Sequence, residues 1–405
     1  MMSFFNRLLS ISSWEKSGRK TKLILFTLFA LGIAALCWSG VRDRAIDFVQ
    51  RYRMGVMVRY GQDPATVVND ANARIDLPES LVPPDFSPYH IDFPWTQSFF
   101  ALLSTLNPKP ALVVFQFLQI CCLVLSMIIC VRYLTRKFHI ERLLATMLVS
   151  LFFLCSYVRT DIKVGNTGLF ALCGMLLLYY GWENKKVWIE AIGVALLCMK
   201  PQTGFLFVLL LMLERHFVSL VLAGIICFLV SVPEMIWLHK IPWDFLRNML
   251  SVKFVFSVEP QTCGFFCVCY QIMPQKVLMA CNMIVAVAIL VFYWWRFPVK
   301  DPMLKLLPAA IGTMFWTYSR TYHLLFLIVP LLCLTGMLKS YEEENKPPCF
   351  VALLMVLLWL PLKQTFPTYI FLVKYLVSIF AIFYIGNHYR TKDSCKSEQT
   401  PSAPA

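Results

Sequence analysis

Charged and amide side chains border or interrupt long apolar blocks in this sequence. Asp47 stands just after the first apolar block, and Lys200-Pro201-Gln202 divides a later one. A carboxylate can take a proton from an attacking hydroxyl group. Lysine and arginine can hold a phosphate through charge-assisted hydrogen bonds. These residue types predict a site for a lipid-linked phosphate substrate at a membrane–water boundary.

The candidate site draws on segments that lie far apart in the sequence. We interpret Asp47 as the general base. The expected substrate-binding residues are Asn166, Lys200, Gln202, Gln261, Arg320, Tyr322 and His323. We expect no metal ion, because Cys263, Cys267 and Cys269 have no histidine or fourth ligand nearby at metal-ligand spacing. We also expect no cofactor.

Each candidate also has a structural alternative. Asp47 could pair with Arg44 or Arg51 on its own helix, at spacings that support such pairs. Asp92 could replace Asp47 as the base. Lys200 could cap a helix or snorkel to the interface.

The other charged residues near apolar runs have similar alternatives. Arg320 stands at a helix end, where arginine is common, and His323 could satisfy a neighbouring helix. Glu234 and Lys374 lie within apolar runs and could be purely structural.

The composition indicates which elements must position these residues. The chain has 405 residues, of which 59% are hydrophobic and 15% are charged. Soluble domains carry about 25% charged residues. The composition therefore excludes a soluble globular enzyme, a disordered protein and a nucleic-acid binder, and it predicts an all-α, polytopic helical membrane protein. The net charge of +14 falls mostly in short loops, where it sets orientation.

The apolar blocks predict about ten spanning helices. They cover residues 23–38, 110–131, 142–158, 166–182, 216–237, 275–295, 303–318, 322–338, 348–362 and 366–387. Residues 188–213 form two shorter apolar runs on either side of Lys200, with basic residues at both outer ends. A re-entrant hairpin with Lys200 at its tip fits this pattern, and one long kinked helix is the alternative.

Basic residues predict the orientation of the chain. With both termini in the cytoplasm, the cytoplasmic loops carry more lysine and arginine than the short external loops. We expect residues 1–390 to form one membrane domain and 391–405 to form a disordered cytoplasmic tail. The segments expected together on the external face are 40–95, which forms the first external loop, 159–165, 239–274 and 319–321.

Several short motifs, in order over residues 40–340, resemble those of glycosyltransferase family 87. Asp47-Phe48 with the later Gly61-Gln-Asp-Pro64 resembles the first external loop of that family, and residues 93–106 resemble its Tyr-Pro-Pro motif followed by Phe-Ala-Leu-Leu. The remaining matches are Gly165-Asn166 to Gly-Gln-x-Asn, Lys200-Pro201-Gln202 to Lys-Pro-Gln, and Tyr318-Ser319 to His323 to Ser-x-x-x-His-Tyr.

The sequence departs from the family pattern at a few positions. Asn166 stands where the family usually has glutamine, and Gly168 where it usually has asparagine. Trp95 replaces the second proline, and Leu324 follows His323 in place of an aromatic residue. These departures concern acceptor-side details rather than the fold.

The resemblance implies a GT-C-like fold with its active site on the extracytoplasmic face. It implies polyprenyl-phosphate sugars as donors, and glycolipids or polysaccharides as acceptors. The acidic residue of the first external loop, the family's proposed base, maps onto Asp47. We therefore expect an inverting, metal-independent hexosyl- or pentosyltransferase, mannosyltransferase-like, in a bacterial inner membrane.

Other functions remain open from the sequence. A lipid-linked saccharide flippase or transporter would also bury charges and break helices, although such proteins usually show repeated halves and this sequence has no visible repeat. A lipid-linked saccharide polymerase or ligase, or an inactive scaffold that has kept the fold, are further alternatives.

Overall fold

The structure is a computed structural model, and the part of the chain that it describes is mainly helical. The described residues are 11–41, 45–64, 77, 93–241, 243–244, 274–314, 321–344, 346–360 and 368–398. Within these ranges the regular elements are helices, without a strand. The predicted all-α class is confirmed for these residues.

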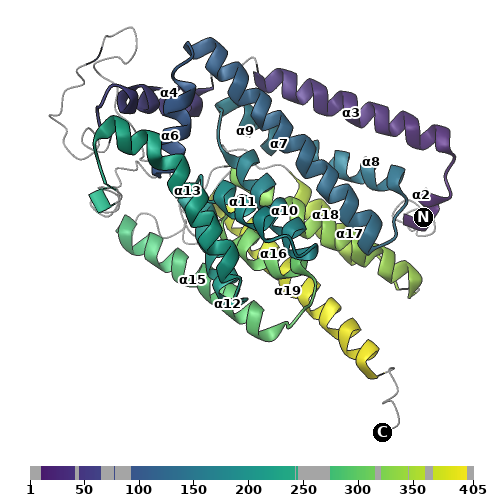
Figure 1. Ribbon diagram of the computed structural model, residues 1–405. Helices are drawn as coiled ribbons and strands as arrows, with labels where there is room; N and C mark the ends of the chain where they lie inside the picture. Colours follow the sequence, from purple (N-terminus) through teal and green to yellow (C-terminus); the bar gives the residue numbers. More distant parts are fainter. Residues whose placement is uncertain are drawn as a thin grey trace.

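Short turns join many of the helices, which pack lengthwise against one another (Figure 1). The elements are α2 Ile11–Glu15, α3 Arg19–Val41, α4 Ile46–Arg59, α6 Pro94–Leu103, α7 Pro108–Lys137, α8 Arg142–Phe153, α9 Ser156–Val164, α10 Gly168–Glu183, α11 Val187–Leu197, α12 Pro201–Leu213, α13 Phe217–Leu238, α15 Gln275–Arg296, α16 Pro302–Gly312, η3 Thr321–Leu327, α17 Ile328–Glu343, α18 Cys349–Trp359 and α19 Thr368–Glu398.

Within the described residues, fewer helices than predicted are both long and apolar enough to cross a membrane. Among the described residues, four are long and apolar enough: Arg19–Ser39, Pro108–Lys137, Phe217–Leu238 and Leu324–Glu343. Helices α8 and α9, bent by 58° at a short break, would together make a fifth. Helices α10, α11, α12, α16 and α18 have 11–16 residues, against the roughly 20 that a span needs, whereas α15 has 22 and α19 has 31. The predicted count of about ten spans is therefore not confirmed.

The outer helices present apolar side chains to their surroundings. Leu28 of α3 is 57% exposed, Phe117 of α7 63% and Leu229 of α13 61%. Large apolar faces of this kind are rare on proteins surrounded by water. Their exposure indicates that these helices face lipid.

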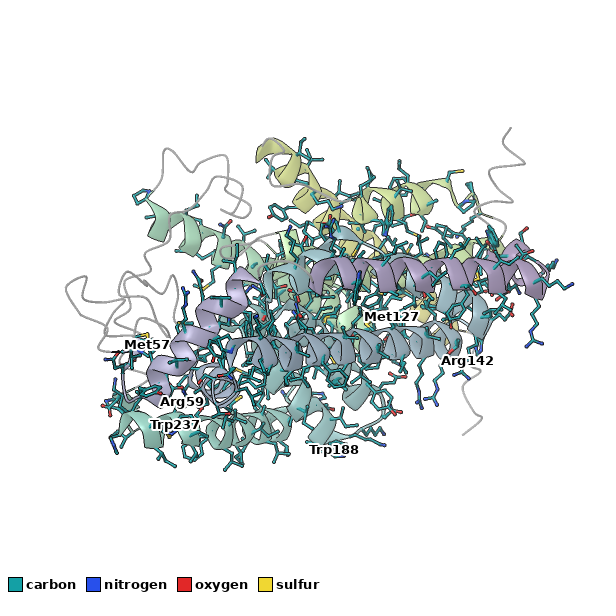
Figure 2. The ribbon with its side chains drawn as sticks, turned by 90° about the horizontal axis from the view of Figure 1, so that it is seen from above. Met57, Arg59, Met127, Arg142, Trp188 and Trp237 are labelled. Atoms are coloured by element: carbon teal, nitrogen blue, oxygen red, sulfur yellow. The ribbon has the colours of Figure 1, made fainter. Side chains whose placement is uncertain are left out.

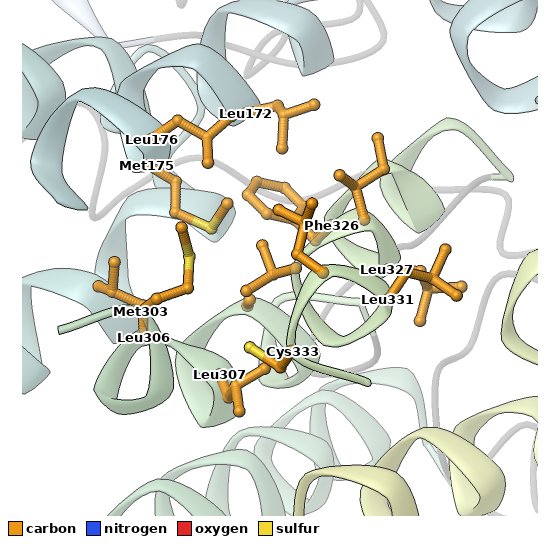
Figure 3. Packing of buried hydrophobic residues seen from close by; sticks show 14 of the residues in the cluster. Leu172, Met175, Leu176, Met303, Leu306, Leu307, Phe326, Leu327, Leu331 and Cys333 are labelled. Atoms are coloured by element: carbon orange, nitrogen blue, oxygen red, sulfur yellow. The ribbon is translucent and has the colours of Figure 1, made fainter. Parts of the chain in front are cut away.

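The core lies where α10, α16, η3 and α17 meet (Figure 3). Met175 of α10, Met303 of α16 and Leu332 of α17 are fully buried, and Phe326 of η3 is 1% exposed. A helix that is packed on all sides is apolar all round, as α10 is over most of its length. This core holds α10, whose first residues carry part of the candidate site.

Helices α11 and α12 form a hairpin with its turn at Lys200. Pro201 begins α12 at a position where its missing N–H costs no hydrogen bond. At the far ends of the two arms, Glu190 pairs with His216, 2.9 Å away, and also accepts from Ser219. One continuous helix would separate residues 190 and 216 by about 39 Å. The chain therefore reverses at Lys200, and the kinked-helix alternative is wrong.

Ion pairs gather at the end of the bundle away from α4 and α6. They join Lys22 to Glu141, Lys339 to Glu15, Lys137 to Asp301 and Lys305 to Glu214. Figure 2 shows Arg142 at this end and Arg59 with Trp237 at the other. The loops that the basic residues predict as cytoplasmic thus share one end of the molecule. Their assignment to the cytoplasm remains a prediction.

The C-terminal helix α19 extends further than predicted. It continues to Glu398, so a disordered tail that begins at residue 391 is wrong for residues 391–398. Lysine and glutamate are good helix formers, and the first proline after this point is Pro401. The Thr391 hydroxyl also donates to the Asn387 carbonyl one turn earlier. Residues 399–405 lie outside the described part of the chain.

Candidate functional site

Asp47 lies in the first turn of α4, just beyond the first long helix. Ala45 precedes this helix in the left-handed conformation, with φ 43°, and its N–H donates to the Lys163 carbonyl at 3.1 Å. A carboxylate is favoured at a helix N-terminus because the backbone N–H groups there carry partial positive charge. The Asp47 side chain is half-buried, so it remains within reach of a bound molecule.

Asn166 meets Asp47 from the loop between α9 and α10. Gly165 ends α9 with φ 69°, and a Cβ there would lie 2.5 Å from the Cβ of Phe48. Glycine therefore allows the loop to approach α4 closely. The Asn166 Nδ2 donates to the Asp47 carboxylate, and its Oδ1 accepts from the Thr167 N–H at 2.7 Å.

Lys200 reaches the same asparagine from the hairpin turn. Its side chain is only 5% exposed overall, and Nζ lies 3.3 Å from Asn166 Oδ1. Snorkelling to water is thus not its role here. The turn is held by α6: Trp95 Nε1 donates to the Cys198 carbonyl at 3.0 Å, and Thr96 Oγ1 to the Met199 carbonyl at 2.8 Å.

A second layer of polar side chains supports the Asn166 loop. Asp161, fully buried, accepts from the N–H groups of Gly168 at 3.1 Å and Leu169 at 3.0 Å, and so caps the start of α10. Gln119 of α7, also buried, donates from Nε2 to the Asn166 carbonyl at 2.8 Å. Asp161 lies close enough to Lys200 and to Asp47 to interact electrostatically with both side chains. Two carboxylates and one ammonium therefore share this region.

Aromatic packing and a tight helix contact fix α4 in place. The ring centroid of Phe48 lies 5.3 Å from that of Phe115 and 6.1 Å from that of Phe100. A Cβ on Gly55 would lie 2.4 Å from the Phe100 carbonyl oxygen, so α4 and α6 touch backbone to backbone. The Tyr52 hydroxyl donates to the Leu106 carbonyl at 2.8 Å. Burial raises the pKa of this phenol above its ordinary value, and the positive charge of Arg59 offsets part of that rise.

The structure brings three of the predicted site residues together: Asp47, Asn166 and Lys200. Gln261 and Arg320 lie outside the described residues, as do the side chains of Gln202, Tyr322 and His323. The backbone of η3, which carries Tyr322 and His323, packs against α9 and α10 on either side of the Asn166 loop. The grouping of the described three is a finding, and the roles of the others remain predictions.

Gln119 was not predicted as part of this arrangement, and Asp161 was predicted only as a member of the polar segment that ends at Asn166. Gln119 follows Gln116 within the apolar run of α7, and buried amides in such a run mark polar contacts between helices. Asp161 belongs to the polar segment before Asn166, but its capping of α10 depends on Gly168, where a Cβ would lie 2.3 Å from Asp161 Oδ1. The close approach of Asp161 thus gives a local structural reason for glycine at position 168, where the family usually has asparagine.

Other charged residues named from the sequence have structural partners. Lys374 donates to the carbonyls of Leu357, Leu358 and Leu360 at the end of α18, at 2.6–2.9 Å. Asp63, the aspartate of the Gly61–Pro64 motif, pairs with Lys240. Arg44 and Asp92 lie outside the described residues, so the ion-pair and substitute-base alternatives that involve them stay open.

Comparisons with known proteins point to one family. No curated protein and no solved structure matches the chain. The sequence pattern that defines glycosyltransferase family 87 matches residues 94–335, more than half of the 405 residues. This range includes Asn166 and Lys200, whereas Asp47 lies before it. The resemblance seen in the motifs is confirmed, and the chain belongs to glycosyltransferase family 87.

Proposed function

We propose that this glycosyltransferase moves a hexose or pentose from a polyprenyl-phosphate sugar to a glycolipid or polysaccharide acceptor on the extracytoplasmic face of a membrane. The observation that carries the proposal is the contact chain from Asp47 through Asn166 to Lys200. In this chain of contacts, a half-buried carboxylate and a buried ammonium group both contact the same amide side chain. These are the two kinds of charge that the transfer of a sugar from a lipid phosphate requires.

The proposed reaction is a single displacement at the anomeric carbon. The acceptor hydroxyl oxygen attacks that carbon while its proton passes to Asp47. The bond between the anomeric carbon and the phosphate oxygen breaks, and its electron pair leaves with the lipid monophosphate. Attack from the face opposite the phosphate inverts the anomeric centre. A lipid monophosphate is a reasonable leaving group, and so the reaction as proposed assigns its stabilisation to side-chain cations rather than to a metal ion.

Lys200 and Asn166 take different parts in this proposal. Lys200 would stabilise the charge that develops on the departing phosphate, at about 1.5–3 kcal/mol for a hydrogen bond to a charged group. Asn166 would act as a positioning residue, because its amide fixes the carboxylate of Asp47 and its carbonyl oxygen faces Lys200. Arg320, His323 and Tyr322 would complete the phosphate site, with Gln202 and Gln261 as further substrate contacts.

The test is a transfer assay with purified protein in detergent. Polyprenyl-phosphate mannose, glucose or arabinose is supplied with a lipid acceptor, and release of polyprenyl phosphate is measured. Asp47→Asn should lower turnover by about 10²- to 10⁴-fold. Asp63→Asn is the matched control, because Asp63 pairs with Lys240 beyond the other end of α4.

The outcomes separate the proposal from its competitors. Full activity in Asp47→Asn would show that another group is the base. Movement of a lipid-linked sugar across vesicles without any transfer would favour a flippase. Family membership supports sugar transfer over transport.

A further inference from the structure

An apolar groove is lined by α3, α8, α17 and α18, with α2 at one end. It has a volume of about 430 Å³. Two of its few polar side chains are already engaged, since the Thr335 hydroxyl donates to the Leu331 carbonyl at 2.8 Å and Trp359 Nε1 to the Leu151 carbonyl at 3.2 Å. The surface that it offers to a ligand is therefore mainly hydrocarbon.

The groove opens toward the surrounding lipid along α18. Val356 lines it and is still 53% exposed. On α8 the lining runs from Leu144 to Phe152, a distance of about 12 Å along the helix axis. The hydrocarbon core of a bilayer is roughly 30 Å thick, so one leaflet supplies about 15 Å. The length of the groove thus matches an acyl chain that belongs to a single leaflet.

The end of the groove beside α2 is basic. Trp14 and Leu25 line the groove, and the chain between them contains the turn from α2 into α3, residues 16–20, which we call the basic turn. The exposed basic residues in this turn and at the start of α8 are Lys16, Arg19, Lys20 and Arg142. Helix α3 has no acidic residue in its first turn, so its first backbone N–H groups add partial positive charge.

The acidic side chains that hold α2 in place already have partners. Glu141 pairs with Lys22, and Glu15 pairs with Lys339 at 2.5 Å. Glu342 accepts from backbone N–H groups at the start of α2. Within the part of the chain that the structure describes, no ion pair joins the four exposed basic residues to an acid. Their charge is available to an anionic headgroup.

We infer that this groove binds an acyl chain of an anionic phospholipid from the surrounding bilayer, with the lipid phosphate at the basic turn. Lysine and arginine beside a membrane surface attract anionic lipids, and tryptophan, here Trp14, favours the level of the headgroups. A zwitterionic lipid would fill the groove equally well but would leave the basic turn without a counter-charge. The site is separate from the Asp47–Asn166–Lys200 contacts, because the basic turn lies at the end of the bundle away from α4 and α6.

Two positions on α18 allow the groove to be blocked with a matched control. Val356 and Leu353 are both 53% exposed, but only Val356 lines the groove. Val356→Trp should therefore obstruct the opening, whereas Leu353→Trp adds the same ring to the same helix outside the groove.

A second pair of variants tests the charge. Arg19→Gln combined with Lys20→Gln removes two positive charges from the basic turn. Lys185→Gln combined with Lys186→Gln is the matched control, because these exposed lysines lie between α10 and α11 and neither lines the groove.

The experiment measures binding of phosphatidylglycerol and of phosphatidylcholine with identical acyl chains to the purified full chain by native mass spectrometry. The wild type should bind phosphatidylglycerol about tenfold or more tightly, since each basic residue near a lipid phosphate contributes a factor of about five. The Arg19 and Lys20 double variant should lose about tenfold or more of this preference. Val356→Trp should weaken both lipids about fourfold or more, because at least one methylene loses its contacts.

The controls separate this site from other lipid contacts. Leu353→Trp and the Lys185 and Lys186 double variant should bind both lipids as the wild type does. Lys200→Met should also keep the preference for phosphatidylglycerol, which shows that the lipid is not in the candidate sugar-transfer site. Thermal unfolding should confirm that every variant is folded.

Three results would overturn the inference. Equal affinity of the wild type for the two lipids would make the groove a seat for ordinary boundary lipid. An unchanged preference in the folded Arg19 and Lys20 double variant would remove the basic turn from the site. Equal weakening by Leu353→Trp and Val356→Trp would place the lipid elsewhere on α18. None of these results bears on the sugar-transfer assay, so the proposed function stands or falls separately.

Discussion

The amide of Asn166 donates to the carboxylate of Asp47, although the two residues are 119 positions apart in the chain. The same side chain accepts from Lys200 through its oxygen. An amide can do both because it carries donors on nitrogen and an acceptor on oxygen. Asn166 therefore sets the separation between the proposed base and a cation, and changes to it should affect the reaction more than the fold.

Asn166→Ala should lower kcat because Asp47 loses the hydrogen bond that orients it. A loss of about 1–3 kcal/mol corresponds to roughly 5- to 150-fold. Asn184→Ala is the matched control at the opposite end of α10, where Asn184 donates to the Tyr180 carbonyl. Steady-state transfer rates of the two variants are the measurement. Equal rates for both would show that the Asn166 contact has no part in turnover.

Lys200→Met should weaken recognition of the lipid phosphate. It removes the charge but keeps an unbranched side chain, and Lys200→Arg should retain part of the function. We expect the inhibition constant of undecaprenyl phosphate to rise by about 10-fold or more in Lys200→Met. Lys185→Met, at the other end of the bundle and exposed, should not change it. An inhibition constant that is insensitive to Lys200→Met would contradict a role in phosphate binding.

Gly168→Ala should disturb the layer of polar side chains that supports the Asn166 loop. The new Cβ would lie 2.3 Å from Asp161 Oδ1, so Asp161 must move from the N–H groups that it caps. We expect a loss of about 1–3 kcal/mol in stability and a lower transfer rate. Gly18→Ala, where a Cβ meets no atom within 4 Å, is the control. Thermal unfolding and transfer assays decide the matter, and a Gly168→Ala protein that matches Gly18→Ala in both would refute the capping argument.

The sequence points to individual residues of this candidate site but not to their arrangement in space. Asp47 and Lys200 stand out because charges beside apolar blocks are costly and need a reason. That Asn166 joins them depends on the left-handed turn at Gly165 and on the contact of that glycine with Phe48, which no local pattern reveals.

Breaks within apolar helices were harder to predict for a related reason. In segments that are apolar throughout, a break such as the one between α8 and α9 leaves no mark in the hydropathy. The hairpin at Lys200 was predictable because Lys200 and Pro201 interrupt the apolar run and basic residues stand at both of its outer ends. Its reversal also brings Glu190 and His216 together, which gives a test of the fold that is independent of catalysis.

Glu190→Ala should destabilise the hairpin. Glu190 is 3% exposed, pairs with His216 and accepts from the Ser219 hydroxyl, so its removal leaves two donors without their acceptor. We expect a loss of about 1–3 kcal/mol, visible as a lower unfolding temperature in detergent. Glu183→Ala, an exposed glutamate on the adjoining helix α10, should have little effect. Undecaprenyl phosphate should raise the unfolding temperatures of Glu190→Ala and of the wild type by the same amount, because Lys200 lies at the opposite end of the hairpin. Equal stability of the two variants would mean that the ends of α11 and α13 are held together by other contacts.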